Sequence, residues 1–187
     1  MSVPLIETKR LLLRPFLTTD AEALFAYASA PEFSQYVEYP SPNTLQEVQD
    51  FLQQVLMAAD PDCLSLAICQ RDQSQLIGSI QMTREAIDHM SVHYDVSHTV
   101  YGNGFATEAL RGVLQWGLMN LPEVTQFCGD TQASNVASRR VMEKCGLVSF
   151  KTENVVWEKF DQPVALVFYS VEREVLQTKA QISGVAE

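Results

Sequence analysis

The sequence lacks the signatures of several common protein classes. Its four cysteines, Cys63, Cys69, Cys128 and Cys145, show no CxxC spacing, so neither a zinc site nor a dithiol redox motif is indicated. No apolar run reaches the roughly 18 residues that a membrane helix needs, and the apolar stretch near the start is broken by charged residues at 7, 9 and 10. We therefore expect four buried thiols, no metal, no membrane contact and a soluble, cytoplasmic protein.

Positive charge is also scarce. Lysine and arginine number 13 against 23 aspartates and glutamates, which gives a formal charge of −10. This balance argues against a nucleic-acid or anionic-membrane surface and fits a cationic or amine-bearing partner. The acidity can equally serve solubility alone, because net charge describes association and not a site.

No linker rich in proline, glycine or serine divides the 187 residues. A chain of this length has the size of one domain, and 47% apolar residues are enough to build its core. We expect a single domain over residues 5–175, followed by a flexible tail over 176–187, where apolar residues become few.

The first half of the chain predicts a helical arm and a hairpin. A strand is expected from Arg10, then a helix over 18–29 with Thr19 and Glu22 in capping-box spacing, and a second helix over 44–59. Strand-like runs at 63–69 and 76–82 flank a polar turn. A third strand over 91–100 alternates apolar Val92, Tyr94 and Val96 with the polar His93, Asp95 and Ser97.

The second half predicts a parallel crossover and a closing hairpin. Helical spacing follows the glycines at 102 and 104, a strand is expected at 124–129, and a helix over 135–145 stops at Gly146. The closing hairpin is expected to pair 153–160 with 164–171. The sum is an α/β (α+β) fold with a mixed, mostly antiparallel sheet of about six or seven strands and about four helices.

The segment "GNGFA", residues 102–106, lies between a predicted strand and a predicted helix. Glycine permits positive φ and close approach of a ligand, and the first amides of a helix have no partner, so a phosphate group would fit there. A plain tight turn is the alternative. The P-loop is excluded because Gly-Lys-Ser/Thr is missing, and the dinucleotide fingerprint is disfavoured because Thr107 replaces its third glycine.

The sequence contains three separated motifs, "IETKRLLLRPFLTTDAEALF", "YGNGFATEA" and "NVASRRVMEKCGL". Together they resemble the GNAT superfamily of acetyl-CoA-dependent N-acetyltransferases. "YGNGFATEA" at 101–109 is similar to the W-G-x-G-x-A-T-E-A string of the branch that acetylates ribosomal-protein N-termini, with Tyr101 for tryptophan. "NVASRRVMEKCGL" at 135–147 resembles N-x-x-S-x-R-V-x-E-K-x-G-F and departs at Leu147, and the start "IETKRLLLRPFLTTDAEALF" is also similar. The resemblance covers roughly residues 5–172 and implies a single-domain GNAT-like fold.

The resemblance also implies a cofactor site for acetyl-CoA. The backbone of the loop would bind its pyrophosphate, the strand at 91–98 would diverge from its neighbour so that backbone near Val96 holds the pantetheine, and Asn135 would contact the same arm, unless it serves only as a helix N-cap. The implied cofactor-binding residues are Val96, Tyr101, Gly102, Asn103, Gly104, Phe105, Ala106, Thr107 and Asn135.

Acetyl transfer to an amine needs a base, an oxyanion donor and an acid for the leaving thiolate. His93 and Asp95 are candidate bases on the polar face of their strand, and the Val96 amide is the candidate oxyanion donor. Ser138 matches the serine that would protonate the CoA sulfur, although it can instead bond its own helix. Met142 stands where many family members have a tyrosine, and methionine donates no proton.

From these residues we expect an acetyl-CoA-dependent N-acetyltransferase that transfers acetyl directly, in a ternary complex, to a primary amine. The acceptor is a small molecule or a protein N-terminus. A non-catalytic acyl-CoA-binding module is the alternative that Met142 keeps open. We also expect a homodimer. Nucleic acid is not expected as a partner.

Overall fold

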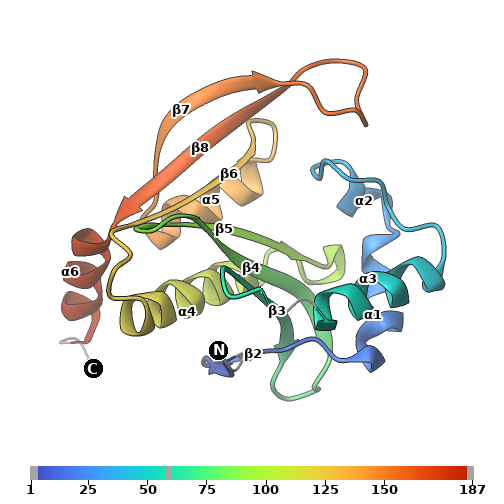
Figure 1. Cartoon of the computed structure of the whole chain (residues 1–187), viewed down its shortest axis with the longest axis horizontal. Helices are drawn as coiled ribbons and strands as arrows, with labels where there is room; N and C mark the ends of the chain where they lie inside the picture. The colour runs from blue at the N-terminus through green and yellow to red at the C-terminus, as the bar shows by residue number, and fades with distance from the viewer. Residues whose placement is uncertain (1–3, 58–59, 185–187) are drawn as a thin grey trace.

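A mixed sheet of eight strands forms the centre of the computed structural model, which describes residues 4–57 and 60–184 (Figure 1). The order is β1-β2-β3-β4-β5-β6-β8-β7. The strands are β1 (Ile6–Glu7), β2 (Leu11–Arg14), β3 (Cys63–Gln70), β4 (Leu76–Ala86), β5 (His89–Val96), β6 (Gln126–Gln132), β7 (Val148–Val155) and β8 (Val164–Glu172). The predicted fold class is confirmed, with a sheet slightly larger than expected.

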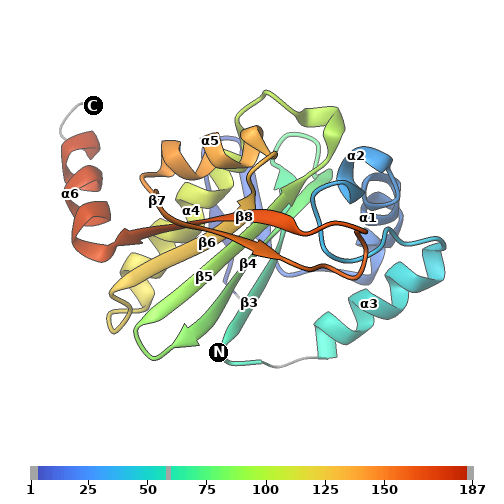
Figure 2. The ribbon, with the colours of Figure 1, turned by 90° about the horizontal axis from the view of Figure 1, so that it is seen from above.

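Helices cover both faces of this sheet (Figure 2). They are α1 (Ala21–Ala28), α2 (Pro31–Ser34), α3 (Leu45–Met57), α4 (Phe105–Asn120), α5 (Val136–Cys145) and α6 (Arg173–Gly184), with short 3-10 turns at Thr18–Asp20 and His98–Val100. Strand alternation sends Leu66 and Ile68 into the core shared with α4 and α5, whereas Ala67 and Cys69 enter a second core under α1 to α3.

The sheet divides where β5 meets β6. The two strands run parallel and pair only from His89↔Gln126 to Ser91↔Cys128, whereas β6 stays paired with β8 along its whole length, Gln126 to Gln132. Beyond Ser91 the block β6-β8-β7 therefore swings away from β5, as Figure 1 shows. The helix between them, α4, makes the predicted parallel crossover.

Most predicted elements are confirmed, but the third strand is shorter than expected. The helix at 45–57 and the hairpin of β3 and β4 agree with the spacing in the sequence, and residues 58 and 59 of the helix predicted over 44–59 lie outside the described residues. Strand β5, however, ends at Val96. Ser97 then caps the 3-10 turn, and its side chain accepts a hydrogen bond from the amide of Thr99 at 3.4 Å. This local bond competes with continuation of the strand.

Two other predictions were wrong in position or kind. Strand β7 covers 148–155, and most of the predicted 153–160 strand is a loop. Thr19 and Glu22 form no capping box at α1, because Asp20 is the N-cap and its carboxylate binds Arg14 at 2.7 Å. The domain bounds 5–175 and the flexible tail at 176–187 stay predictions: α6 starts directly after β8 and buries Leu176 in the core, and residues 185–187 lie outside the described residues.

Candidate active site

The glycine loop precedes α4 and has the conformation that the sequence predicts. Gly102 and Gly104 have φ of 80° and 79°, which lie in the left-handed region. Gly104 is the N-cap of α4, and the first intrahelical bond runs from the Glu108 amide to its carbonyl at 3.0 Å. The amides of residues 105–107 precede that bond and have no helical partner. Tyr101 to Gly104 are exposed, so a ligand can reach the loop.

Backbone groups of β5 line the gap that opens toward β6. The Ser97 amide donates to the Ile77 carbonyl at 2.7 Å, and hydrogen-bonded pairs alternate along an antiparallel ladder. Val96, opposite Gly78, therefore turns its amide away from β4 and toward the gap. On the other side, a Cβ at Gly129 would lie 2.8 Å from the Val92 carbonyl oxygen, so only glycine fits where the strands part.

Ser138 faces the gap from the first turn of α5 and pairs with a tyrosine of β5. Tyr94 donates a hydrogen bond to the Ser138 carbonyl at 3.0 Å, and the two hydroxyls also lie 3.0 Å apart. Burial raises the pKa of Tyr94. The hydrogen bond with Ser138 acts in the opposite direction, but the effect of burial is larger. Tyr94 therefore stays protonated and holds the serine hydroxyl in place.

Asn135 is the N-cap of α5, which is the alternative to pantetheine contact that the sequence leaves open. Its Oδ1 accepts a hydrogen bond from the Ser138 amide at 3.1 Å. That bond orients the start of the helix and so the Ser138 side chain. The Nδ2 group of Asn135 remains as the donor for a ligand, and its contact with pantetheine stays a prediction.

Asp95 lies on the opposite face of β5, under α1. Its carboxylate accepts hydrogen bonds from the Tyr27 hydroxyl at 2.8 Å, the Ser79 hydroxyl at 2.6 Å and the Ser79 amide at 3.2 Å. Burial raises the pKa of Asp95, and these bonds oppose the rise. Because three donors already engage its oxygens, the geometry suits the fixing of Tyr27 better than proton removal from an acceptor.

His93 is the more accessible of the two candidate bases. Its side chain is exposed, and it shares a strand face with Asp95. Across the gap lies Asp130 of β6. Burial raises the pKa of Asp130, and the neighbouring His93 opposes that rise. The structure thus places His93 at the narrow end of the gap, two residues past the last pair of β5 and β6, and its role as the base stays a prediction.

Two further expectations concern thiols and metals. Cys69 and Cys145 are buried, but Cys63 and Cys128 are only half-buried, so the expectation of four buried thiols was wrong for two of them. Among residues 4–57 and 60–184, no group of three or more metal-ligating side chains occurs. The described helices also include none that is both long and apolar enough to cross a bilayer.

Residues 10–148 match the family described as the acetyltransferase (GNAT) domain. The chain belongs to the GNAT acetyltransferase family. Two Bacillus subtilis proteins are similar along this GNAT chain: the uncharacterized N-acetyltransferase YoaA, 28% identical over 156 residues (82% of this chain, 86% of YoaA), and YnaD, 30% identical over 145 residues (76% and 81%). The resemblance seen in the sequence is confirmed, and the protein is an acetyltransferase.

Solved structures share the GNAT fold. Mycobacterium smegmatis RimJ in complex with CoA-disulfide has a TM-score of 0.80 at 16% identity, with 92% of this chain and 89% of that chain covered. Vibrio cholerae spermidine N-acetyltransferase in complex with CoA and spermine has a TM-score of 0.78 at 13% identity, with 91% and 99% covered. At this identity the likeness establishes the fold.

Several residues of the candidate site were not recognised from the sequence. Tyr94 was assigned only to an apolar face, although its position on that face points it at α5. The partners of Asp95, Tyr27 and Ser79, are 68 and 16 residues away in the chain. The local signal is that Tyr94 shares a strand face with the apolar Val92 and Val96, because a buried tyrosine hydroxyl needs a hydrogen-bond partner.

Gly104→Ala tests the loop. A Cβ there would meet only the Arg10 Nη2 atom, at 3.7 Å, so the penalty is conformational and amounts to about 1–2 kcal/mol for a left-handed alanine. A relaxed loop must return to this conformation to bind, and we expect CoA affinity to fall by about tenfold. Calorimetric titration measures it. Gly104→Asn is the control that should retain more affinity, because asparagine tolerates positive φ; unchanged affinity in the alanine variant would rule out the loop assignment.

Proposed function

We propose that this protein transfers the acetyl group of acetyl-CoA directly to a primary amine in a ternary complex. The observation that carries the proposal is the gap between β5 and β6, which opens beside a glycine loop in left-handed conformation and faces the Tyr94–Ser138 pair. The acceptor is a protein N-terminus or a small-molecule amine.

The described residues fit acetyl-CoA, which supplies an activated acetyl thioester when bound. Loop amides from Gly102 to Thr107 would hold the pyrophosphate, aided by the positive end of the 16-residue helix α4. The Val96 amide and the Asn135 side chain would hold the pantetheine and acetyl. A well-aimed backbone donor such as Val96 contributes about 3–4 kcal/mol to acyl transfer.

Two side chains would transfer protons during the reaction. The Ser138 hydroxyl, oriented by Tyr94, would donate a proton or hydrogen bond to the departing sulfur. His93, exposed at the narrow end of the gap, would take the proton of the amine directly or through water, since histidine is the residue type that changes charge near neutral pH. Asp95, on the face of β5 under α1, would take no part in proton transfer and would fix the Tyr27 hydroxyl by a hydrogen bond.

A bridge encloses the side on which the acceptor would bind. The Lys159 ammonium, in the loop between β7 and β8, donates to the carbonyls of Ser34, Val37 at 3.2 Å and Tyr39 at 3.0 Å. Gln132 of β6 also donates to the Gln35 carbonyl at 3.2 Å. Both views show this loop beside the segment after α2 (Figures 1 and 2). An acceptor passing under the bridge would need to be narrow near its amine.

Lys159→Met should loosen the bridge without touching the loop at 101–104. We expect the KM for the acceptor to rise roughly three- to tenfold, because hydrogen bonds from a charged donor are lost, while CoA affinity stays the same. Steady-state kinetics with a saturating donor measures this. Lys151→Met, which removes an exposed partner of Glu153 on β7, is the matched control. An unchanged acceptor KM would speak against a role for the bridge.

Titration with CoA together with a thiol-release assay tests the whole proposal. The acceptors are ribosomal-protein N-terminal peptides, polyamines and aminoglycosides, each assayed with acetyl-CoA between pH 6 and 9. Turnover on an amine supports the enzyme. CoA binding with no turnover on any amine would instead support the non-catalytic acyl-CoA-binding alternative, in which the buried Met142 marks lost chemistry. Sedimentation in the same buffer tests the homodimer that the sequence analysis predicts.

A further inference from the structure

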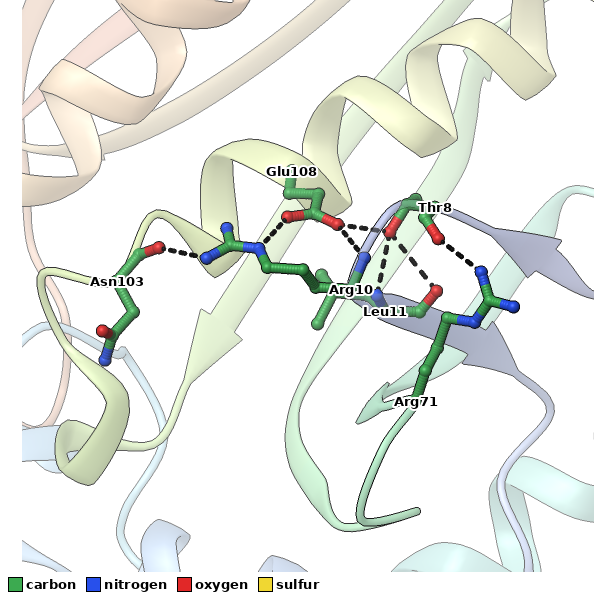
Figure 3. A network of polar contacts seen from close by, with 6 residues as sticks. All are labelled: Thr8, Arg10, Leu11, Arg71, Asn103 and Glu108. Carbon is green, nitrogen blue, oxygen red and sulfur yellow. Dashed lines mark hydrogen bonds and ion pairs between the residues drawn. The ribbon is translucent and has the colours of Figure 1, made fainter.

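Arg10 connects the start of the chain to the glycine loop (Figure 3). It lies in the turn between β1 and β2, and its Nη1 donates a hydrogen bond to the Asn103 carbonyl at 3.0 Å. The guanidinium also lies over the Phe105 ring, 4.5 Å from the centroid. One side chain thus contacts both the loop and the first residue of α4.

Glu108 holds this arginine in place. Its Oε2 pairs with the Arg10 Nε at 2.7 Å, and its Oε1 accepts from the Arg10 amide and the Thr8 hydroxyl, each at 2.7 Å. Burial alone would raise the pKa of Glu108, but the hydrogen bonds from Thr8 and Arg10 outweigh it and lower the pKa. The carboxylate is therefore ionised at neutral pH and fixes Arg10 in a single orientation.

Peptide geometry carries the effect of Arg10 to the ligand side of the loop. The Asn103 carbonyl and the Gly104 N–H belong to one planar trans peptide, so they point in opposite directions. With the carbonyl fixed on Arg10, the Gly104 N–H points away from Arg10. A cation hydrogen-bonded to the carbonyl also polarises the peptide and makes that N–H a stronger donor.

Charge gives Arg10 a second effect. Glu108 lies in the first turn of α4, where a carboxylate benefits from the helix dipole but competes with any other anion at the same end. The Arg10 guanidinium neutralises it at 2.7 Å. Without the arginine, an uncompensated negative charge would remain one helical turn from the loop.

We propose that Arg10 is a positioning residue for the acyl donor: it orients the Gly104 N–H toward the pyrophosphate and cancels the charge of Glu108. The inference rests on the proposed binding of acetyl-CoA at the loop. It predicts that Arg10 matters only for donors that carry a pyrophosphate.

The test compares acetyl-CoA with S-acetylpantetheine, which lacks the pyrophosphate. In Arg10→Ala we expect kcat/KM for acetyl-CoA to fall by about tenfold, mainly through KM, because a charge-assisted bond is lost, while kcat/KM for S-acetylpantetheine stays at the wild-type value. Adding Glu108→Gln to Arg10→Ala should restore part of the loss. Arg10→Lys keeps the positive charge but lacks the planar guanidinium, so its kcat/KM for acetyl-CoA should lie between the values of wild type and Arg10→Ala.

Arg71→Ala is the matched control, because Arg71 donates to the Thr8 carbonyl at 2.9 Å on the same turn and its described contacts do not include the loop. It should behave as wild type with both donors. Arg10→Gln keeps a polar side chain without the charge and replaces Arg10→Ala if that variant does not fold. Wild-type kinetics in Arg10→Ala, or an equal loss with both donors, would overturn the inference. Failure of the wild type to bind CoA would instead refute the proposed function on which it rests.

Discussion

Replacement of Ser138 by alanine is expected to lower kcat by about 100-fold, the lower range for loss of a general acid, with little change in CoA affinity. A thiol of pKa about 8.5 leaves more easily when a donor meets its sulfur. Ser138 has that donor beside the gap, and the bond from Tyr94 to its backbone carbonyl survives the substitution. The helix start also survives, since Asn135 caps through the Ser138 amide.

Rapid-quench or thiol-release kinetics at saturating acetyl-CoA gives kcat, and calorimetry gives the affinity. Ser134→Ala is the matched control, because its hydroxyl lies just before α5 and bonds Gln132 at 3.2 Å. Tyr94→Phe should give an intermediate loss, since the serine hydroxyl remains but loses its anchor. A Ser138→Ala enzyme as fast as wild type would leave the serine with a packing role only.

Gly78→Ala is expected to lower the free energy of unfolding by about 3 kcal/mol, the upper range for overpacking. A Cβ at Gly78 would lie 2.2 Å from the Asp95 carbonyl oxygen and 2.9 Å from the Val96 Cα. Both obstacles are backbone atoms of β5, so β4 and β5 must move apart. That movement would also displace the Val96 amide at the gap, and we expect activity to fall with stability.

Urea unfolding followed by circular dichroism measures this change. The control is Gly112→Ala in α4, where a Cβ would meet the Thr8 side-chain methyl at 3.0 Å. A shift of a few tenths of an ångström relieves this contact, and alanine favours helix by about 1 kcal/mol over glycine, so this variant should stay near wild type. A Gly78→Ala protein with an unchanged urea midpoint would contradict the tight fit between β4 and β5.

The fold was predictable wherever the hydrophobic period was strong. Helix α3 and the β3–β4 hairpin follow from such patterns, and the glycines before α4 mark its start. Strand β7 was misplaced because its apolar residues do not alternate in burial: Val148 and Phe150 are 68% and 63% exposed. The pattern at 153–160 looked more regular, yet those residues contribute the bridging Lys159.

The site was predictable only where one segment supplies it. The loop at 101–107 and the Asn135–Ser138 helix start are local and could be recognised from motifs. The Tyr94–Ser138 pair joins residues 44 apart, and the Arg10–Glu108 pair joins residues 98 apart. These residues come together only because the sheet order places β5 beside α5 and the turn between β1 and β2 beside α4.

Main-chain groups of β5, the Val96 amide and the Val92 carbonyl, face the gap between β5 and β6. Every residue except proline carries an amide. Side-chain replacements at position 96 thus leave this donor in place, whereas proline removes it. On the proposed function, the half of the site that would hold acetyl-CoA would accordingly tolerate wide sequence change, while a change of acceptor would act through side chains such as Lys159 and His93.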